Sequence, residues 1–284
     1  MTEGSALPSD RTIAVIVATY NNPQGLRHCL AGLCAQTLSD FEVVIADDGS
    51  DDRTREVLRE PAWGQLRIRH VWQADRGYRV RMARNRAISQ TPASFLLFLD
   101  GDCIPRDDWV ARHVKYCPRG CFLAGARLDI PPSVHSHFQE ADVRSQRVFD
   151  TGFLTRWEPG LNRYRLRLAR NTIWESIADL ATWRWCVFVS SNGSAWRDDI
   201  LAVNGFDEAF PGYGSDDRDL GVRLRNSGVR PRYRKFSLVV LHLDHGKPYD
   251  DPEVRARNRA AFKRRIHDGT TRIEQGIDTV MLRD

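Results

Sequence analysis

Two aspartates with one glycine between them form the segment of this chain that could most readily hold a metal ion. Asp100-Gly101-Asp102 follows the apolar run at residues 95–99, which predicts a buried strand ending at the first aspartate. Side chains alternate along extended chain, so both carboxylates project from the same side, and the glycine lets a ligand come close. Such oxygen ligands suit Mg²⁺ or Mn²⁺ carrying a diphosphate, although a solvated acidic turn has the same sequence.

A second acidic cluster, at residues 47–52, follows another apolar run at residues 41–46. Its four carboxylates repel one another unless something uses them, and one of them could accept the imide N–H of a uracil ring. Asp and Ser also favour helix N-caps and turns. The cluster therefore fits nucleoside binding and a structural turn equally well.

Two further groups lie in the second half of the chain. Residues 212–219 read Gly-Tyr-Gly-Ser-Asp-Asp-Arg-Asp, an aromatic between glycines followed by an acidic helix start. The helix dipole favours aspartates there without any function, whereas a carboxylate held at a cleft could take a proton from a sugar hydroxyl. His242 and His245 follow a later strand, and a neutral imidazole there could complete a metal site begun by Asp102.

The elements that must position these groups alternate between strand and helix. Apolar, β-branched runs predict strands at residues 13–18, 41–46, 66–72, 95–99 and 122–128, with helical spacing of apolar residues between them. This rhythm is typical of βαβ units, so we expect an α/β fold with a mostly parallel sheet and helices on both faces. Ligands bind beyond the carboxyl ends of such strands, where both acidic clusters lie.

Residues 131–185 break the alternation. Arginines mix there with the aromatics Trp157, Tyr164, Trp174, Trp183 and Trp185. We expect a helical, partly mobile insertion that forms a lid, a wall for the acceptor or a surface facing an anionic membrane, because aromatic rings beside cations suit lipid headgroups. The alternative is that the tryptophans pack in the core or the acceptor cleft. Beyond the insertion, regular structure resumes at residues 187–190. We expect one helix that starts near residue 198, two more at 216–226 and 252–268, and a strand at 236–241.

Composition limits the class of protein. Arginine supplies 38 of the 42 basic residues among 284, and the formal net charge of +5 suits anionic partners. No run approaches 18 apolar residues, the N-terminus lacks a signal-peptide pattern, and the six cysteines form no disulfide framework. These features predict a cytoplasmic protein, with peripheral contact at the inner face of the membrane as the alternative.

Five segments together resemble a known family. VIVATYN (15–21), VVIADDGSDD (43–52), ARN (83–85) and FLDGDCIP (98–105) resemble inverting glycosyltransferase family 2, which has the GT-A fold. Residues 204–220, NGFDEAFPGYGSDDRDL, resemble the G-W-G-x-E-D-x-D element of β-galactosyl- and N-acetylgalactosaminyltransferase-type domains. The resemblance implies a donor half at 1–130 and a catalytic and acceptor half at 187–250, and the pattern of the chain adds the insertion at 131–186 and a basic C-terminal helix and tail at 251–284.

For the donor, the resemblance implies binding by residues near the first strand ends. Asp48 matches the aspartate that binds the nucleoside, and Asp47 lies beside it. Thr19 and Tyr20 would line the base pocket, and Arg84 matches a basic residue near the donor.

For the chemistry, the resemblance implies a metal motif and a base. Asp100 and Asp102 match the metal–diphosphate motif, in which the last aspartate contacts the metal, and His242 matches a late metal-ligand histidine. Asp217 matches the second acid of the Glu-Asp pair, the usual catalytic base. The first acid of that pair is Asp216 here and the Trp of the element is a Tyr, which leaves the sugar and the acceptor fit open.

We therefore expect a Mn²⁺- or Mg²⁺-dependent inverting hexosyltransferase. It would move a sugar from a UDP-linked donor to a hydroxyl of a glycan or glycolipid acceptor in bacterial surface polysaccharide or lipopolysaccharide synthesis. A sugar-nucleotide pyrophosphorylase would instead need a glycine-rich phosphate loop after the first strand, where this chain has TYNNPQG. A basic nucleic-acid binder would need a recognised binding module, and the acidic clusters would repel phosphate without a metal.

Overall fold

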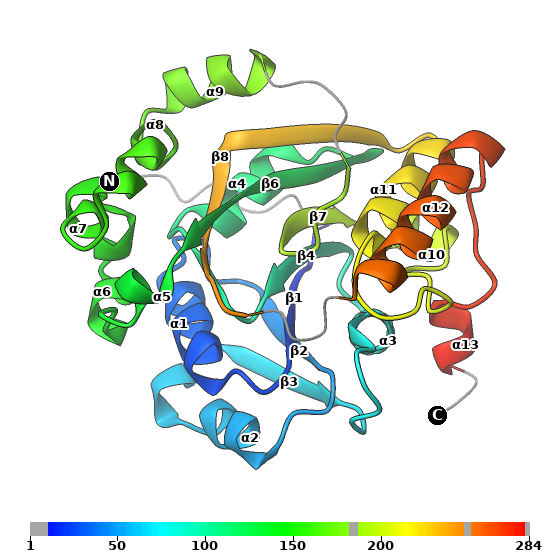
Figure 1. Ribbon diagram of the computed structural model, residues 1–284, viewed down its shortest axis with the longest axis horizontal. Coiled ribbons are helices and arrows are strands. Elements are labelled where there is room, and N and C mark those ends of the chain that lie inside the picture. Colours follow the sequence, from blue (N-terminus) through cyan, green and yellow to red (C-terminus); the bar gives the residue numbers. More distant parts are fainter. Residues whose placement is uncertain (1–10, 182–186, 247–250, 282–284) are drawn as a thin grey trace.

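A mixed sheet with the strand order β3-β2-β1-β4-β7-β6-β8-β5 organises the computed structural model, which describes residues 11–181, 187–246 and 251–281 (Figure 1). The strands are β1 (Ile13–Thr19), β2 (Glu42–Asp47), β3 (Arg67–Trp72), β4 (Phe95–Asp100), β5 (Cys103–Pro105), β6 (Cys121–Ile130), β7 (Asn192–Trp196) and β8 (Arg230–Leu243). The first four run parallel, β8 runs parallel to β6, and β7 and β5 are antiparallel to their neighbours. The predicted α/β fold with a mostly parallel sheet is confirmed.

Helices cover both faces of this sheet. They are α1 (Pro23–Cys34), α2 (Asp52–Leu58), α3 (Val80–Ser89), α4 (Trp109–Tyr116), α5 (Pro132–His135), α6 (Glu140–Arg144), α7 (Thr151–Thr155), α8 (Arg165–Leu168), α9 (Thr172–Ala181), α10 (Arg197–Ala202), α11 (Asp216–Asn226), α12 (Pro252–Asp268) and α13 (Ile277–Met281). Asn22 caps α1 as expected, because its side chain accepts a hydrogen bond from the Gly25 N–H, with Pro23 at the first helical position.

The apolar strands divide their side chains between two cores. On β4, Phe95, Leu97 and Leu99 belong to the core beneath α1 and α4, whereas Leu96 and Phe98 belong to the core beneath α3 and α11. Successive side chains of a strand point to opposite faces, so a continuous apolar run is the pattern of a strand buried on both faces. This double burial fixes where each strand ends.

The register of the sheet brings the acidic strand ends together. Thr19 at the end of β1 lies opposite Asp47 on β2, and Ala18 lies opposite Asp100 on β4. On the far edge, β5 pairs with β8 so that Cys103 lies opposite His242. The residue before Cys103 is Asp102, so the pairing carries this aspartate to the histidines of β8.

One central strand was not predicted. β7 lies between β4 and β6, but its sequence NGSAW has none of the β-branched residues that mark the other strands. Its small residues are required by close packing, since a Cβ on Gly193 would lie 2.5 Å from the Val189 carbonyl oxygen. β8 is also longer than the predicted strand at 236–241, because its first half alternates cations with other residues.

The insertion is helical, as expected. Its first part packs on the same core as α1 through Val143, Leu154, Leu161 and Leu168, whereas α9 lies outside β8 at the upper edge of Figure 1. Trp157 and Trp174 are about two-fifths exposed, and Trp183 and Trp185 lie outside the described residues. Among the described residues, no helix combines the length and apolar character needed to cross a bilayer.

Candidate active site

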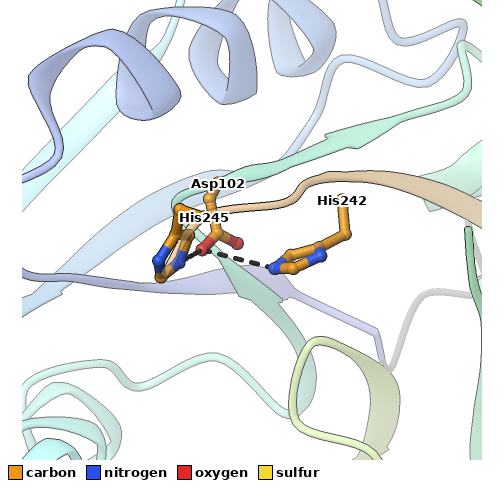
Figure 2. Close-up of side chains that lie close together, drawn as sticks. All are labelled: Asp102, His242 and His245. Carbon is orange, nitrogen blue, oxygen red and sulfur yellow. Dashed lines mark hydrogen bonds and ion pairs between the residues drawn. The ribbon is translucent and has the colours of Figure 1, made fainter. Parts of the chain in front are cut away.

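One carboxylate and two imidazoles converge at the end of β8. Figure 2 shows the side chains of Asp102, His242 and His245 turned toward one another, with ligand atoms all within 4.8 Å. The Asp102 carboxylate lies 2.8 Å from His245 Nε2 and 3.7 Å from His242 Nε2. The structure therefore brings together the predicted Asp102 and His242, and it adds His245, which the sequence had offered as a second histidine.

Neighbouring groups hold both imidazoles in place. His242 Nδ1 lies 2.9 Å from an Asp129 carboxylate oxygen, and His245 Nδ1 lies 2.7 Å from the Gly246 carbonyl oxygen. A proton on each Nδ1 serves these contacts, and the Nε2 atom of each ring faces Asp102, where a metal could take the place of the Nε2 proton. This is the arrangement by which second-layer contacts orient histidines that bind metals.

The donor set fits a divalent metal. Burial alone would raise the pKa of Asp102, but the hydrogen bond with His245 and the charges of both histidines hold that pKa below its usual range. Asp102 is therefore ionised at neutral pH, and one carboxylate with two imidazole nitrogens suits a divalent transition-metal ion such as Mn²⁺ better than Ca²⁺ or Mg²⁺, which prefer oxygen ligands. Asp102, His242 and His245 would hold the metal.

Asp100 belongs to a different set of contacts. Its carboxylate lies 2.8 Å from Arg84 Nη2, while Nη1 of the same guanidinium lies 3.6 Å from Asp216. Arg84 is 5% exposed and comes from α3, so it joins the end of β4 to the start of α11. The two carboxylates of the Asp-Gly-Asp segment thus diverge in this structure, one toward the arginine and one toward the histidines.

Asp217 has the electrostatics of a base. Burial, together with the charge of Asp216, raises the pKa of Asp217 to about 7, although the Arg218 backbone N–H and the nearby arginines oppose the shift. A carboxyl that titrates near neutral pH can both accept a proton and release it. Of the predicted catalytic pair, Asp217 is the residue whose surroundings suit proton transfer.

An unusual turn presents these two acids. Gly212, Gly214 and Ser215 have φ values of 50°, 106° and 69°, and Ser215 occupies the N-cap of α11 without a side-chain capping bond. A non-glycine residue in the left-handed region is uncommon and is often found at functional sites. The backbone of this turn is therefore specialised for placing Asp216 and Asp217 at the helix start.

The predicted nucleoside residues differ in their placement. Asp48 lines a cavity of about 670 Å³ together with Thr19 and Tyr20. Its carboxylate accepts hydrogen bonds from Gln73 Nε2 at 2.6 Å and from the Arg79 backbone N–H at 2.7 Å. These bonds fix the direction in which Asp48 faces the cavity.

Thr19 and Asp47 complete this picture. Thr19 lines this cavity, and its buried hydroxyl has no hydrogen-bond partner among the described residues. Asp47 lines neither large cavity, since its carboxylate accepts from the Ser50 N–H at 2.8 Å and lies 2.8 Å from His70 Nε2. The structure thus places Asp47 behind the site, where it orders the turn after β2.

Two cavities meet at Asp100 and Arg84. The first contains Asp48 and the metal cluster, and the second, of about 850 Å³, contains Asp216 and Asp217. Two residues that sequence reasoning missed, Tyr78 and Arg127, line both cavities, together with Tyr213 of the predicted 212–219 element. For Arg127 a signal existed, because it is a cation within the apolar run at 122–128.

Two family models match the chain. Residues 14–134 match Glycosyl transferase family 2, and residues 183–245 match the N-terminal domain of galactosyltransferase. The first range holds the donor-side residues and Asp102, and the second holds Asp216, Asp217 and both histidines.

Curated relatives are longer than this chain. Validoxylamine A glucosyltransferase of Streptomyces hygroscopicus subsp. jinggangensis is 34% identical over 229 residues, covering 76% of this chain and 52% of the relative. Chondroitin synthase of Escherichia coli is 27% identical over 256 residues, covering 87% of this chain and 37% of the relative. The chain thus spans about half or less of the length of these relatives.

Solved structures show the same fold. The mannosyltransferase PcManGT from Pyrobaculum calidifontis, in complex with GDP-Man and Mn²⁺, matches with a TM-score of 0.56 and 20% identity over 84% of this chain and 59% of its own. Staphylococcus aureus TarS 1-349, in complex with UDP-GlcNAc, matches with a TM-score of 0.57 and 14% identity over 88% of this chain and 65% of its own. At these identities the likeness concerns the arrangement of the backbone.

Proposed function

The chain belongs to glycosyltransferase family 2 with a GT-A fold, and from that premise we propose that it is a metal-dependent, inverting hexosyltransferase. The observation that carries this proposal is the meeting of two cavities at Arg84 and Asp100. One cavity offers a metal cluster and a nucleoside-side carboxylate, and the other offers a base. A donor and an acceptor bound on either side would meet where they join.

In the proposed reaction, Asp217 takes the proton of an acceptor hydroxyl, and the oxygen attacks the anomeric carbon from the face opposite the diphosphate. The carbon–diphosphate bond breaks and the configuration inverts, so no covalent enzyme intermediate forms. Arg84 lies where it can stabilise negative charge on the leaving diphosphate, and Arg127 lines the same cavity. A divalent metal, when bound, neutralises charge on the same diphosphate.

For the donor we propose a UDP-sugar. The oriented Asp48 carboxylate has remaining lone pairs for an imide N–H, and the unpaired Thr19 hydroxyl lies in the same cavity. A UDP-sugar occupies TarS, whereas PcManGT holds a GDP-sugar, so base choice depends on side chains rather than on the fold.

For the acceptor we propose a glycan or glycolipid of bacterial surface polysaccharide or lipopolysaccharide synthesis, used by a cytoplasmic enzyme. A polysaccharide synthase among the relatives supports this choice. The second cavity is large enough for more than one sugar ring and carries Arg218 and Arg259 at its wall.

A donor hydrolysis screen tests the proposal. UDP-, GDP- and dTDP-sugars are incubated with the protein and Mn²⁺, and the released nucleoside diphosphate is measured with and without EDTA. We expect release from UDP-sugars that EDTA abolishes and that Asp102→Ala lacks. Release from none of these donors, or release that is unchanged in EDTA, would contradict a metal-dependent transferase.

A further inference from the structure

Helix α9 turns its apolar side chains outward. Ile173, Ile177 and Leu180 are 74%, 58% and 75% exposed, and Trp174 beside them is 42% exposed. Their spacing of four and three residues places the first three on one face of the helix. The acidic residues of α9 face the protein instead, so the usual polarity of a surface helix is inverted.

Buried ion pairs on the side of α9 that faces the protein fix this orientation. Glu175 is fully buried, and its carboxylate lies 2.5 Å from Arg112 Nη1 and 3.4 Å from Arg106 Nη1. Turning α9 over would take Glu175 away from both arginines and leave Asp108 as the carboxylate that they share, at a cost in free energy. The apolar face is therefore held outward by the charges behind it.

A second acid secures α9 to β8. The pairing of β8 with β6 shifts between Gly125 and Ala126, so residues 235–238 of β8 have no partner on β6. Asp179 accepts hydrogen bonds from the backbone N–H groups of Phe236 at 2.8 Å and Ser237 at 3.2 Å within this bulge. The helix thus satisfies backbone groups that the sheet leaves free.

The surroundings of this face are cationic. From residue 159 to 180 every exposed charged side chain is an arginine, because the two acids of that stretch are buried: Arg163, Arg165 and Arg170 are exposed, and Arg167 is half-buried. Burial and the charge of Arg167 lower the pKa of Lys235 on the adjacent bulge, as expected for cations crowded together. Leu166, which is 50% exposed, adds a further apolar side chain.

We propose that the apolar face of α9 and the arginines that precede it in the chain bind the surface of an anionic phospholipid bilayer. Trp and aliphatic residues on one face of a helix, with arginines in the adjoining segment, have the chemistry of an interfacial helix, which lies in the membrane plane. Two copies of this chain would bring like-charged surfaces together, so charge complementarity favours lipid phosphate over self-association.

Vesicle co-sedimentation of the full chain tests this surface. We expect binding to vesicles of phosphatidylcholine with about one-third phosphatidylglycerol, loss of binding at 0.5 M salt, and little binding to phosphatidylcholine alone. A triple substitution, Ile173→Ser with Ile177→Ser and Leu180→Ser, should reduce the bound fraction about tenfold or more. Arg165→Gln with Arg167→Gln should weaken binding to anionic vesicles severalfold.

The matched control is Ile266→Ser on α12, which removes an apolar side chain of similar exposure, 46%, from another surface. It should leave vesicle binding unchanged. Asp217→Asn should also bind vesicles normally, so a failure of the proposed transfer reaction is measured apart from a failure of this surface. Circular dichroism of each variant verifies folding.

Two outcomes would overturn the proposal. One is the absence of binding to anionic vesicles at low salt. The other is a chain that is dimeric on size exclusion and becomes monomeric with the triple substitution, which would assign the face to a second copy.

Discussion

Helices α9 and α11 both bury acidic side chains, and they do so with opposite results. On α9, arginines and backbone N–H groups surround Glu175 and Asp179. On α11, Asp217 accepts a hydrogen bond from the Arg218 backbone, but no arginine of the described residues lies within ion-pair distance of it. Burial with compensating partners makes a joint between elements, as Asp219 with Arg223 also shows on α11, whereas the half-buried Asp217 lacks such a partner in the described part of the chain and holds its proton up to neutral pH.

Asp102 is a third kind of carboxylate, and its substitution should have the largest effect on transfer. Its partners are two histidines rather than arginines, so it should act as a ligand. We expect Asp102→Ala to lower transfer by more than about 10⁴-fold, since the diphosphate would lose its counter-charge. Mn²⁺ binding, measured by isothermal titration, should be lost with it. Asp129→Asn is the control with an intermediate effect, and it should weaken Mn²⁺ affinity by about 10- to 100-fold. Normal Mn²⁺ affinity in Asp102→Ala would show that the metal does not bind at this cluster.

The next effect concerns the base. Asp217→Asn keeps the size of the side chain but cannot take a proton, so turnover should fall by about 10²- to 10⁴-fold. The affinity for UDP should be retained, because Asp217 lies in the second cavity. Asp216→Asn is the control within the same turn. Normal turnover together with poor UDP affinity in Asp217→Asn would show that Asp217 binds the donor and is not the base.

The pH profile sharpens the same contrast. Because the pKa of Asp217 is raised to about 7, the base is protonated below that pH and ionised above it. The turnover should therefore fall about tenfold per pH unit below 7 and level off above it. Measurement of kcat at saturating donor tests this. A profile that stays flat down to pH 5 would contradict a base with this pKa.

The last comparison between α9 and α11 concerns the stability of the fold. Glu175→Gln leaves two buried arginines with Asp108 as their remaining carboxylate and should destabilise the fold by about 1.5–3 kcal/mol, with little change in kcat of the folded protein. Asp217→Asn removes a carboxyl whose raised pKa makes its ionised form unfavourable, so at pH 8 it should stabilise the fold by about 1–3 kcal/mol. Urea unfolding at pH 8 measures both, and equal destabilisation by the two changes would abolish the contrast.

The sequence predicted the parts of the fold that follow from simple periodicity. Apolar runs followed by acids located the ends of β2 and β4, and Asp48 just after β2 and Asp100 at the end of β4 do line the site. Local periodicity could not separate Asp48 from Asp47, because the contact that turns Asp47 away from the site is made to His70 on β3, a separate strand. It also could not show that β5 carries Asp102 to both histidines, since that depends on a pairing between distant segments.

The sequence of α9 also did not predict that its apolar face points outward. A helix with apolar residues on one face predicts burial of that face, and only the arginines of α4 and its flank reverse this expectation. Arg106 and Arg112 are more than 60 residues away in sequence. Pairing over such a distance is decided by the whole fold.

The bulge in β8 and the metal cluster are separated by a fixed length of one strand. Ser237, at the point where α9 is attached, and His242, in the metal cluster, are five residues apart on one continuous strand. At about 3.3 Å per residue this length is about 16 Å. If α9 rests on a bilayer, the strand limits how far the metal cluster lies from the point where α9 is attached, so an acceptor anchored in that bilayer needs a spacer that bridges this separation.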